Sequence, residues 1–398
     1  MTHLFEQKDH DREPVTGPFP APEDARVLVS HASGVETREA IEQVLDEIEA
    51  EAAELVLVFF AMSHDADVIA EVLDRRTGAR GVGGTTAGEL GELGFTVDGI
   101  SAIALHGTKV RAALEVIPHI DQLSLVPIVN LPDTLARRIG RDKAELSPDR
   151  HFWLTLVDGL SGRESLLTPF FAHVSPHLSL IGGSLADVDF DCVRLVHHGR
   201  VFEDAAAFAL IEYERPFFTF HVTHHHLTDR WFTVTEVSED GRTLWELDGR
   251  PAREVYAEAL GVAPEELDGS SSSPHPFGTR FRGRPFPVSI MTPLDGGGLL
   301  LGAPVHHGER INLLEAGDLV EESRASIARA IEEAGGAEQA RGMLLFHCYG
   351  RFLEAEHGDL LEPLFEAMHQ LPLCGFNTLG EQYGAMHVNH SITGVVFG

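Results

Sequence analysis

Cysteine is scarce in this chain. Its 398 residues include only Cys192, Cys348 and Cys374, which are widely separated in the sequence. An odd, scattered set of cysteines does not build a disulfide framework. We therefore expect reduced thiols and a cytoplasmic protein.

Long apolar runs are also missing. No stretch approaches the roughly 20 apolar residues that a membrane-spanning helix needs, which argues against a membrane protein. The segment from Met1 to Pro22 is polar and rich in proline, without the basic and apolar regions of a signal peptide. We expect residues 1–24 to form a disordered arm.

Positive charge is the third deficit. Lysine and arginine number 30 against 62 acidic residues, a formal net charge of −32, and the only lysines are Lys8, Lys109 and Lys143. So acidic a chain repels phosphate backbones and anionic lipids, which excludes nucleic acid and membrane surfaces as expected partners. We interpret the charge as a highly solvated acidic surface.

The remaining composition is that of a globular protein. Apolar residues make up 43% of the chain and charged residues 23%, both ordinary values. At about 150 residues per domain, the length allows two to three domains with a large core.

Three segments of the sequence resemble one another. They are V-G-G-T-T-A-G-E (82–89), I-G-G-S-L-A-D-V (181–188) and C-G-F-N-T-L-G-E (374–381). Self-similarity of this kind predicts duplicated structural units that share a core. The glycines Gly83, Gly182 and Gly375 recur at one position, so we expect each to serve a tight turn or a positive φ.

Periodicity around these segments predicts strands and helices in a repeating order. The first unit has a strand at Arg26–Ser30 and a helix that Ser33 and Glu36 cap and that runs to about Ala53. The further strands are expected at Leu55–Phe60, Gly99–His106, Val110–Ile117, His151–Val157, Leu178–Ile181, Asp191–His197, Val201–Phe202, Phe208–Ile211, Gly342–Tyr349 and Ser391–Phe397. The further helices are expected at His64–Arg76, Glu164–His173 and His357–Gln370.

This order predicts an α/β (α+β) fold. Duplicated strand–helix–strand–hairpin units would form mixed sheets, with helices on the outer faces. Residues 215–340 do not follow this order of elements. They predict a hairpin at Trp231–Glu246, a helix at Glu254–Leu260, a long surface loop over 262–287 and an amphipathic helix at Gly317–Gly335.

Familiar catalytic and metal motifs are incomplete here. The Gly84–Gly88 segment imitates a nucleophile elbow with threonine, but Gly91 and Gly94 interrupt the helix that such an elbow requires. Neither a phosphate loop nor a calcium loop is complete. The histidine pairs and the run His224–His226 lack zinc-motif spacing, so we interpret them as structural or exposed.

The segment from Gly375 to His390 is the strongest site candidate from the residues alone. It concentrates hydrogen-bonding side chains within a short glycine-punctuated stretch, as a small-molecule pocket does. A polar turn that satisfies its own backbone is the structural alternative. The loop at Ser161–Glu164 precedes a helix, and its backbone N–H groups could hold an anion.

Four segments together resemble the FIST family, in that family's order and across nearly the whole chain from residue 25. They are V-G-G-T-T-A-G-E (Val82 to Glu89), D-G-L-S-G-R-E (Asp158 to Glu164), L-D-G-R-P-A (Leu247 to Ala252) and G-E-Q-Y-G…H-V-N-H (Gly380 to His390). The resemblance implies a FIST N domain at 25–227 and a FIST C domain at 228–398. It also implies a non-enzymatic sensory or signal-transduction protein that binds small ligands such as amino acids.

The expected ligand pocket lies between the duplicated units. Its residues would be Gly83, Gly84, Thr85, Glu89, Ser161, Arg163, Glu164, Asn377, Thr378, Glu381, Tyr383, His387 and Asn389. Arg163 would pair with a ligand carboxylate, because a guanidinium bonds it in a fork.

Three alternatives stay open, and one of them is a purely structural interaction module that binds no metabolite. The other two are a haem protein and an enzyme. Some stand-alone members of the family are similar to haem proteins that sense nitric oxide and regulate a partner histidine kinase. In that case haem b would be held by His387 or His347. The enzyme would have Cys348 or Cys374 as nucleophile beside one of these histidines.

Overall fold

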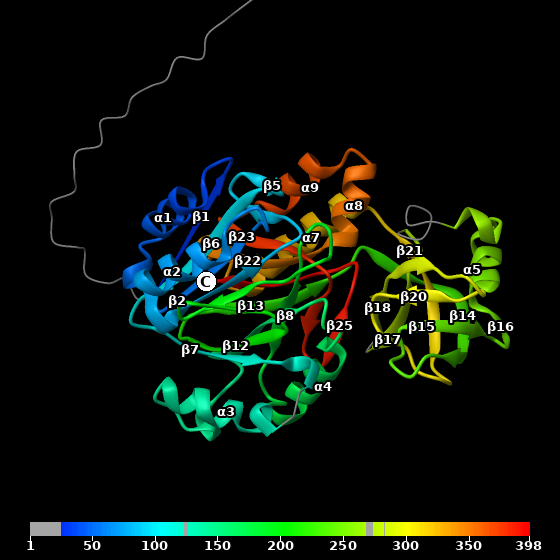
Figure 1. Ribbon diagram of the computed structural model, residues 1–398, viewed down its shortest axis with the longest axis horizontal. Helices are drawn as coiled ribbons and strands as arrows, with labels where there is room; N and C mark the ends of the chain where they lie inside the picture. Colours follow the sequence, from blue (N-terminus) through cyan, green and yellow to red (C-terminus); the bar gives the residue numbers. More distant parts are fainter. Residues whose placement is uncertain (1–24, 123–125, 268–273, 282) are drawn as a thin grey trace, which may run out of the picture.

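The fold consists of three similar units and one inserted sheet. The computed structural model of the protein describes residues 25–122, 126–267, 274–281 and 283–398; the arm expected at 1–24 lies outside them. We call the three units together the body and residues 225–316 the insert. Figure 1 shows the insert, in green and yellow, beside the body.

The units repeat one order of elements. Unit 1 contains β1 (Arg26–Ser33), α1 (Thr37–Glu47), β2 (Leu55–Phe60), α2 (Ala66–Thr77), β3 (Gly81–Thr85), β4 (Glu89–Gly91), β5 (Gly94–Thr96) and β6 (Gly99–His106). Unit 2 contains β7 (Val110–Pro118), α3 (Val126–Arg138), β8 (His151–Asp158), α4 (Glu164–Val174), β9 (Leu180–Leu185), β10 (Leu195–His197), β11 (Arg200–Phe202) and β12 (Ala205–Tyr213).

Unit 3 follows the same order but is interrupted after its first strand. It contains β13 (Phe217–Val222), α7 (Leu319–Glu333), β22 (Gly342–Cys348), α8 (Tyr349–His357), α9 (Leu361–Met368), β23 (Leu373–Thr378), β24 (Glu381–Tyr383), β25 (Met386–Val388) and β26 (Ile392–Phe397). The prediction of duplicated strand–helix–strand–hairpin units in mixed sheets is confirmed.

Each unit gives its hairpin to the sheet of another unit. The sheet orders are β1-β6-β2-β3-β10-β11, β7-β12-β8-β9-β24-β25 and β13-β26-β22-β23-β4-β5. Hairpin β4–β5 of unit 1 thus extends the sheet of unit 3, the hairpin of unit 2 extends sheet 1, and that of unit 3 extends sheet 2. The exchange is cyclic, so no unit completes its sheet alone.

The backbone repeats this exchange at three equivalent positions. The N–H of Thr85 donates to the carbonyl oxygen of Arg194 at 2.9 Å, and that of Ser184 donates to Gly380 at 2.9 Å. The N–H of Asn377 donates to Gly88 at 2.7 Å. Each bond joins the end of a parallel strand to the hairpin of the next unit in the cycle.

The three sheets pack around one central apolar core. Unit 1 contributes Phe59, unit 2 contributes Leu156, and unit 3 contributes Phe346 and Phe376, all of them buried. The ring centroids of Phe59 and Phe376 lie 4.6 Å apart. Strand β2 (L-V-L-V-F-F) is buried along its whole length because the core covers one face and helices the other.

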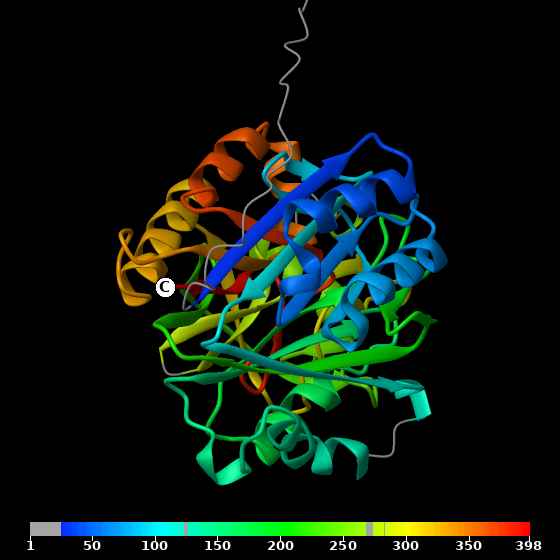
Figure 2. The same ribbon diagram turned by 90° about the vertical axis from the view of Figure 1, so that its left-hand side faces the viewer.

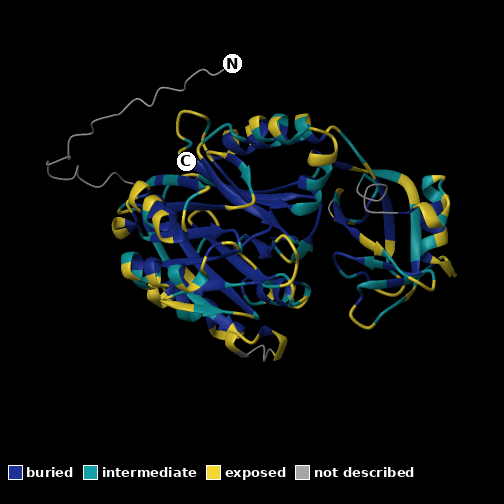
Figure 3. Ribbon diagram, turned by 45° about the horizontal axis from the view of Figure 1, so that its top comes forward, coloured by how far each residue is buried: buried dark blue, intermediate teal, exposed yellow. Residues whose placement is uncertain are grey.

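Helices cover the outer face of each sheet. Figure 2 shows them in three groups around the body: blue (α1 and α2), cyan to green (α3 and α4) and orange (α7 to α9). The buried apolar side chains of each helix group pack against one sheet and form a separate core layer there. Exposed residues lie mainly on the outer helical surfaces and in loops, while the central strands are buried (Figure 3).

The recurring glycines do not form turns, which corrects the prediction made for them. Gly83, Gly182 and Gly375 lie inside β3, β9 and β23 without a positive φ. A Cβ atom at these positions would overlap the carbonyl oxygens of Val58, Thr155 and Leu345, respectively, on the neighbouring parallel strand. The recurrence therefore reflects close backbone approach between paired strands.

Several element boundaries differ from the sequence predictions. Glu36 itself is the N-cap of α1 and accepts from the N–H groups of Arg38 and Glu39, so the capping box with Ser33 is wrong. The helix ends at Glu47 instead of Ala53. The strand expected at Asp191–His197 begins only at Leu195.

Two helices, α3 (Val126–Arg138) and α8 (Tyr349–His357), were not predicted, and another was predicted too long. α8 follows β22 directly, where the strand was expected to continue to Tyr349, and α9 begins at Leu361 instead of His357.

The insert is one antiparallel sheet with a helix. It contains β14 (His225–Val237), β15 (Thr243–Leu247), β16 (Arg250–Pro251), α5 (Ala252–Leu260), β17 (Phe277–Phe281), β18 (Arg284–Val288), β19 (Ile290–Pro293), β20 (Leu299–Leu301) and β21 (Arg310–Ala316). The loop predicted over 262–287 is wrong in its second half, where β17 and β18 pair as a hairpin. The prolines at 285 and 287 are tolerated because β18 is an edge strand.

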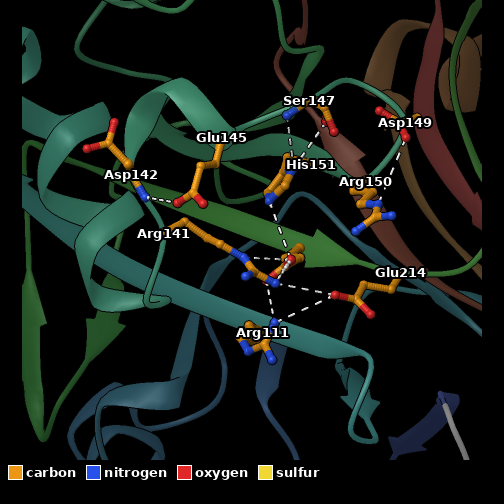
Figure 4. Close-up of polar contacts among 10 residues, drawn as sticks. Arg111, Arg141, Asp142, Glu145, Ser147, Asp149, Arg150, His151 and Glu214 are labelled. Atoms are coloured by element: carbon orange, nitrogen blue, oxygen red, sulfur yellow. Dashed lines mark hydrogen bonds and ion pairs between the residues drawn. The ribbon is translucent and has the colours of Figure 1, made fainter.

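A buried carboxylate closes the rim of sheet 2. Glu212 on β12 accepts from Arg141 Nη2 at 2.6 Å and from Arg111 Nη1 at 2.8 Å, and His151 Nε2 lies 3.7 Å away. Figure 4 shows Arg111, Arg141 and His151 converging from three segments. Burial alone raises the pKa of Glu212, but the two guanidinium groups lower it overall. The carboxylate thereby ties the chain after α3 to the sheet.

Within the described ranges, no helix is both long enough and apolar enough to cross a lipid bilayer.

The glycine positions predict a specific loss of stability. We expect Gly375→Ala to lower the free energy of unfolding by about 3 kcal/mol, because the new Cβ must push β22 and β23 apart. Gly384→Ala is the control, since its position has a φ of 59° and open space around it and should cost about 1 kcal/mol. Urea denaturation of both variants checks this, and equal losses would contradict the packing argument.

Candidate functional site

A cleft separates the body from the insert. Its volume is about 270 Å³. The body contributes α4 and the β24–β25 turn, which lie on the side that faces the insert (Figure 1). The insert contributes β17, β18 and the segment before β21. The lining residues include Ser165, Phe286, His306, Glu309, Met386 and His387.

A chain of buried polar side chains begins at His387. Gln382 Nε2 lies 3.4 Å from His387 Nδ1 and donates to Ser184 Oγ at 2.9 Å. Ser184 Oγ in turn donates to Glu164 Oε1 at 2.9 Å. The second carboxylate oxygen of Glu164 and the Oε1 atom of Gln382 are buried without a hydrogen-bond partner. The cleft therefore adjoins unsatisfied acceptors.

The exchange of hairpins assembles this chain. Glu164 is the first residue of α4 and Ser184 belongs to β9, both in unit 2, whereas Gln382 lies on β24 of unit 3. Because β24 pairs with β9, residue 382 lies opposite Gly182. The missing side chain at Gly182 leaves space, since a Cβ there would lie 3.0 Å from Gln382 Oε1.

Most of the sequence-predicted residues lie in three places. Glu164 and His387 belong to the polar chain next to the cleft, and Asn389 joins the body to the insert by accepting from the Ser289 N–H at 3.3 Å. Gly83, Gly84, Thr85, Glu89, Asn377, Thr378 and Glu381 are buried where the units meet. Only His387 among the predicted residues lines the cleft described above.

The remaining predicted residues have local partners. Ser161 accepts from the Arg163 N–H at 3.2 Å and donates to the carbonyl oxygen of Asp158. The Arg163 side chain donates to the carbonyl oxygen of Asp121. Tyr383 packs against His221, with 5.6 Å between ring centroids. The structure thus does not bring Arg163 to the cleft.

Glu89 and Glu381 are equivalent residues in units 1 and 3. Thr86 donates to Glu89 and Thr378 donates to Glu381, in each case from three residues earlier. Burial raises the pKa of Glu89 to about 7 and that of Glu381 to about 8, despite these hydrogen bonds. Glu381 also accepts from Ser391, ten residues later. These acids brace the exchanged hairpins.

His347 lies in the body interior. Its Nδ1 atom lies 2.9 Å from Asn377 Oδ1, and its ring is 5.3 Å from that of Phe95. Burial, with the charge of Arg351, lowers the pKa of His347 to about 3. The imidazole is therefore neutral, and its Nε2 atom has no hydrogen-bond partner.

Sequence reasoning missed a second polar cluster. His224 Nε2 lies 3.0 Å from Glu354 Oε1, while Arg351 Nη1 lies 2.6 Å from His224 Nδ1. Arg351 is fully buried and also donates to Ser323 Oγ at 2.6 Å. Burial lowers the pKa of Arg351 to about 10, so it remains a cation at neutral pH. The run of three histidines at 224–226 was the available signal.

Two domains of one known family match consecutive parts of the chain. The FIST N domain matches residues 54–250 and the FIST C domain matches residues 252–384. The chain belongs to the FIST family. FIST domains are implicated in small-molecule sensing and signal transduction. The division of this FIST protein at residues 227 and 228 stays a prediction.

Neither the curated proteins nor the solved structures indicate a reaction or a ligand for this chain. No curated protein matches the chain. One solved structure, titled "Cyanuric acid hydrolase: evolutionary innovation by structural concatenation", aligns with a TM-score of 0.39 and 8% identity, covering 94% of this chain and 100% of that chain. That likeness carries no conclusion about the activity of this FIST protein.

The buried acid Glu381 predicts a pH dependence of stability. Its pKa rises from 4.5 to about 8 on folding, so the folded state holds the proton and loses stability as pH rises between those values. We expect Glu381→Gln to gain about 4 kcal/mol relative to the wild type between pH 5 and pH 9. Urea unfolding at several pH values measures this. The exposed Glu356→Gln is the control, and parallel curves for Glu381→Gln and the wild type would contradict the assignment.

Proposed function

We propose that this FIST protein is a non-enzymatic sensor that binds a small molecule in the cleft between body and insert. The observation that carries the proposal is the cleft itself, backed by the buried chain from His387 to Glu164. Ligand pockets commonly lie between domains and combine apolar walls with a few convergent polar groups. Here Phe286 and Met386 supply apolar wall, and His306, Glu309 and His387 supply polar groups.

The chemistry of the cleft favours a ligand that donates hydrogen bonds. Glu309 lines it, and the unpartnered oxygens of Glu164 and Gln382 lie behind His387. Buried acceptors without donors cost free energy. A ligand with an amino group matches them, as the family resemblance to amino-acid sensors suggests. The expected carboxylate contact with Arg163 is not part of this proposal, because Arg163 is engaged elsewhere.

Absence of catalysis is part of the proposal. Cys348 and Cys374 are buried, and burial raises the pKa of Cys374 to about 12 and that of Cys348 further. A thiol that stays protonated is a poor nucleophile. His347 is engaged by Asn377 instead of either thiol.

The haem alternative has little support from the residues expected to hold the iron. His387 Nδ1 lies near Gln382, and the ring also has a backbone hydrogen bond with Gly302. The cleft beside it, at about 270 Å³, falls below the usual range of ligand pockets, roughly 300–1,000 Å³. His347 is packed among aromatic rings. Neither position fits a haem, so we do not include haem b in the proposal.

Signalling through contact with a separate protein, such as a histidine kinase, completes the proposal and rests on the family resemblance. We also propose a cytoplasmic location, which is the usual setting for unpaired cysteines such as the three in this chain.

A blocked cleft should abolish the response to ligand. We expect one or more amino acids or related amines to raise the melting temperature of the wild type, because binding to the native state stabilises it. Ser165→Trp fills the cleft from α4 and should remove this shift. Leu166→Trp is the matched control, since the neighbouring Leu166 is 43% exposed and does not line the cleft. A shift that survives in Ser165→Trp would place the ligand elsewhere.

Thiol labelling separates the sensor from the cysteine enzyme. With an aromatic disulfide reagent at neutral pH, we expect the half-buried Cys192 to react and the two buried thiols to react only after denaturation. Peptide mapping identifies the labelled residue. Rapid labelling of Cys348 or Cys374 in the native protein would support the enzyme instead.

A further inference from the structure

Two histidines and a glutamate meet at the junction between body and insert. His224 and His225 follow β13, and His225 is the first residue of β14. Glu354 belongs to α8 of the body. The insert thus begins at the point where these side chains meet. None of the three belongs to α4, the body helix that lines the cleft.

The three side chains lie at ligating distance from one another. The ring centroids of His224 and His225 are 4.1 Å apart, although the residues are adjacent in the chain. One nitrogen of each ring and one oxygen of Glu354 all lie within 4.8 Å of one another. His224 and His225 are buried, whereas the Glu354 side chain is 18% exposed. The cluster is therefore enclosed yet reachable from one side.

We propose that His224, His225 and Glu354 bind a divalent cation of the zinc type. Two imidazoles and one carboxylate are a donor set that Zn²⁺ takes, with a fourth position left for water or another ligand. Ca²⁺ and Mg²⁺ require mainly oxygen ligands, so this set disfavours them.

Arg351 determines which nitrogen of His224 is available. Its Nη1 atom lies 2.6 Å from Nδ1, and a guanidinium can only donate. Nδ1 is therefore the acceptor, and the ring proton lies on Nε2, which faces Glu354 at 3.0 Å. A metal bound at Nε2 displaces that proton to solvent, so His224 then binds the metal as an imidazolate whose Nδ1 still accepts from Arg351. The buried guanidinium of Arg351 repels a free cation, but its hydrogen bond to Nδ1 stabilises the anionic ring that binds the metal.

His390 lies next to the cluster and could supply a fourth ligand, although its ring nitrogens fall outside the set of atoms that lie within 4.8 Å of one another. It is 4% exposed, and its ring centroid lies 5.2 Å from that of His225. Its Nδ1 atom is buried without a hydrogen-bond partner. His390 follows β25 in unit 3, so its participation would connect the metal to the exchanged hairpin. The bound metal would then hold the base of the insert against the body.

The test is Zn²⁺ binding to the full-length protein after treatment with a chelator. Isothermal titration with ZnCl₂ should show one ion per chain for the wild type. We expect His225→Ala and Glu354→Gln each to weaken binding by about 100-fold or more, and His390→Ala by about 10- to 100-fold. Circular dichroism and melting of the metal-free variants verify that they are folded.

His226→Ala is the matched control, because this neighbour in the same run is 59% exposed and pairs instead with Glu322 at 3.5 Å. It should bind Zn²⁺ like the wild type. The proposal is overturned if the wild type shows no stoichiometric binding, or if folded His225→Ala and Glu354→Gln bind as tightly as the wild type. Equal loss in His226→Ala would also overturn it. These results are independent of the amino-acid response of the cleft.

Discussion

Close approach of parallel strands is the constraint on which this structure depends. In every unit a glycine lies directly opposite a backbone carbonyl of the paired strand, at Gly83, Gly182 and Gly375. Beyond this glycine, each strand donates a backbone N–H to the chain of the next unit. The tight pairing brings the three sheets onto one apolar core, and the exchanged hairpins then close the ring of units.

The buried acids follow from this arrangement. An exchanged hairpin leaves its own sheet, so its polar ends are enclosed between units instead of facing water. In units 1 and 3 the carboxylates of Glu89 and Glu381 occupy these enclosed positions, and each accepts hydrogen bonds from neighbouring hydroxyl groups. Unit 2 has the buried Leu195 at the equivalent hairpin position, opposite Gly84 on β3. The repeat is therefore structural throughout but carries its carboxylates only twice.

Sequence reasoning predicted the units because their apolar strands, such as Leu55–Phe60, are short continuous apolar runs, a pattern that suits a strand buried on both faces. It assigned the three glycines to turns because glycine is favoured both in tight turns and where two strands approach closely, and the sequence alone does not distinguish these causes. The cleft could not be predicted, since Ser165 and Phe286 meet only through the position of the insert. His224 and Glu354 are 130 residues apart, and no local spacing connects them.

The insert enters and leaves the body through a narrow neck. The carbonyl oxygen of His224 accepts from the Gly317 N–H at 2.7 Å, so the two residues that flank the insert are joined directly. A chain segment anchored in this way can be exchanged for another without altering the ring beneath it. One wall of the cleft thus belongs to a replaceable module, and the shape of the cleft can change while the ring keeps its architecture.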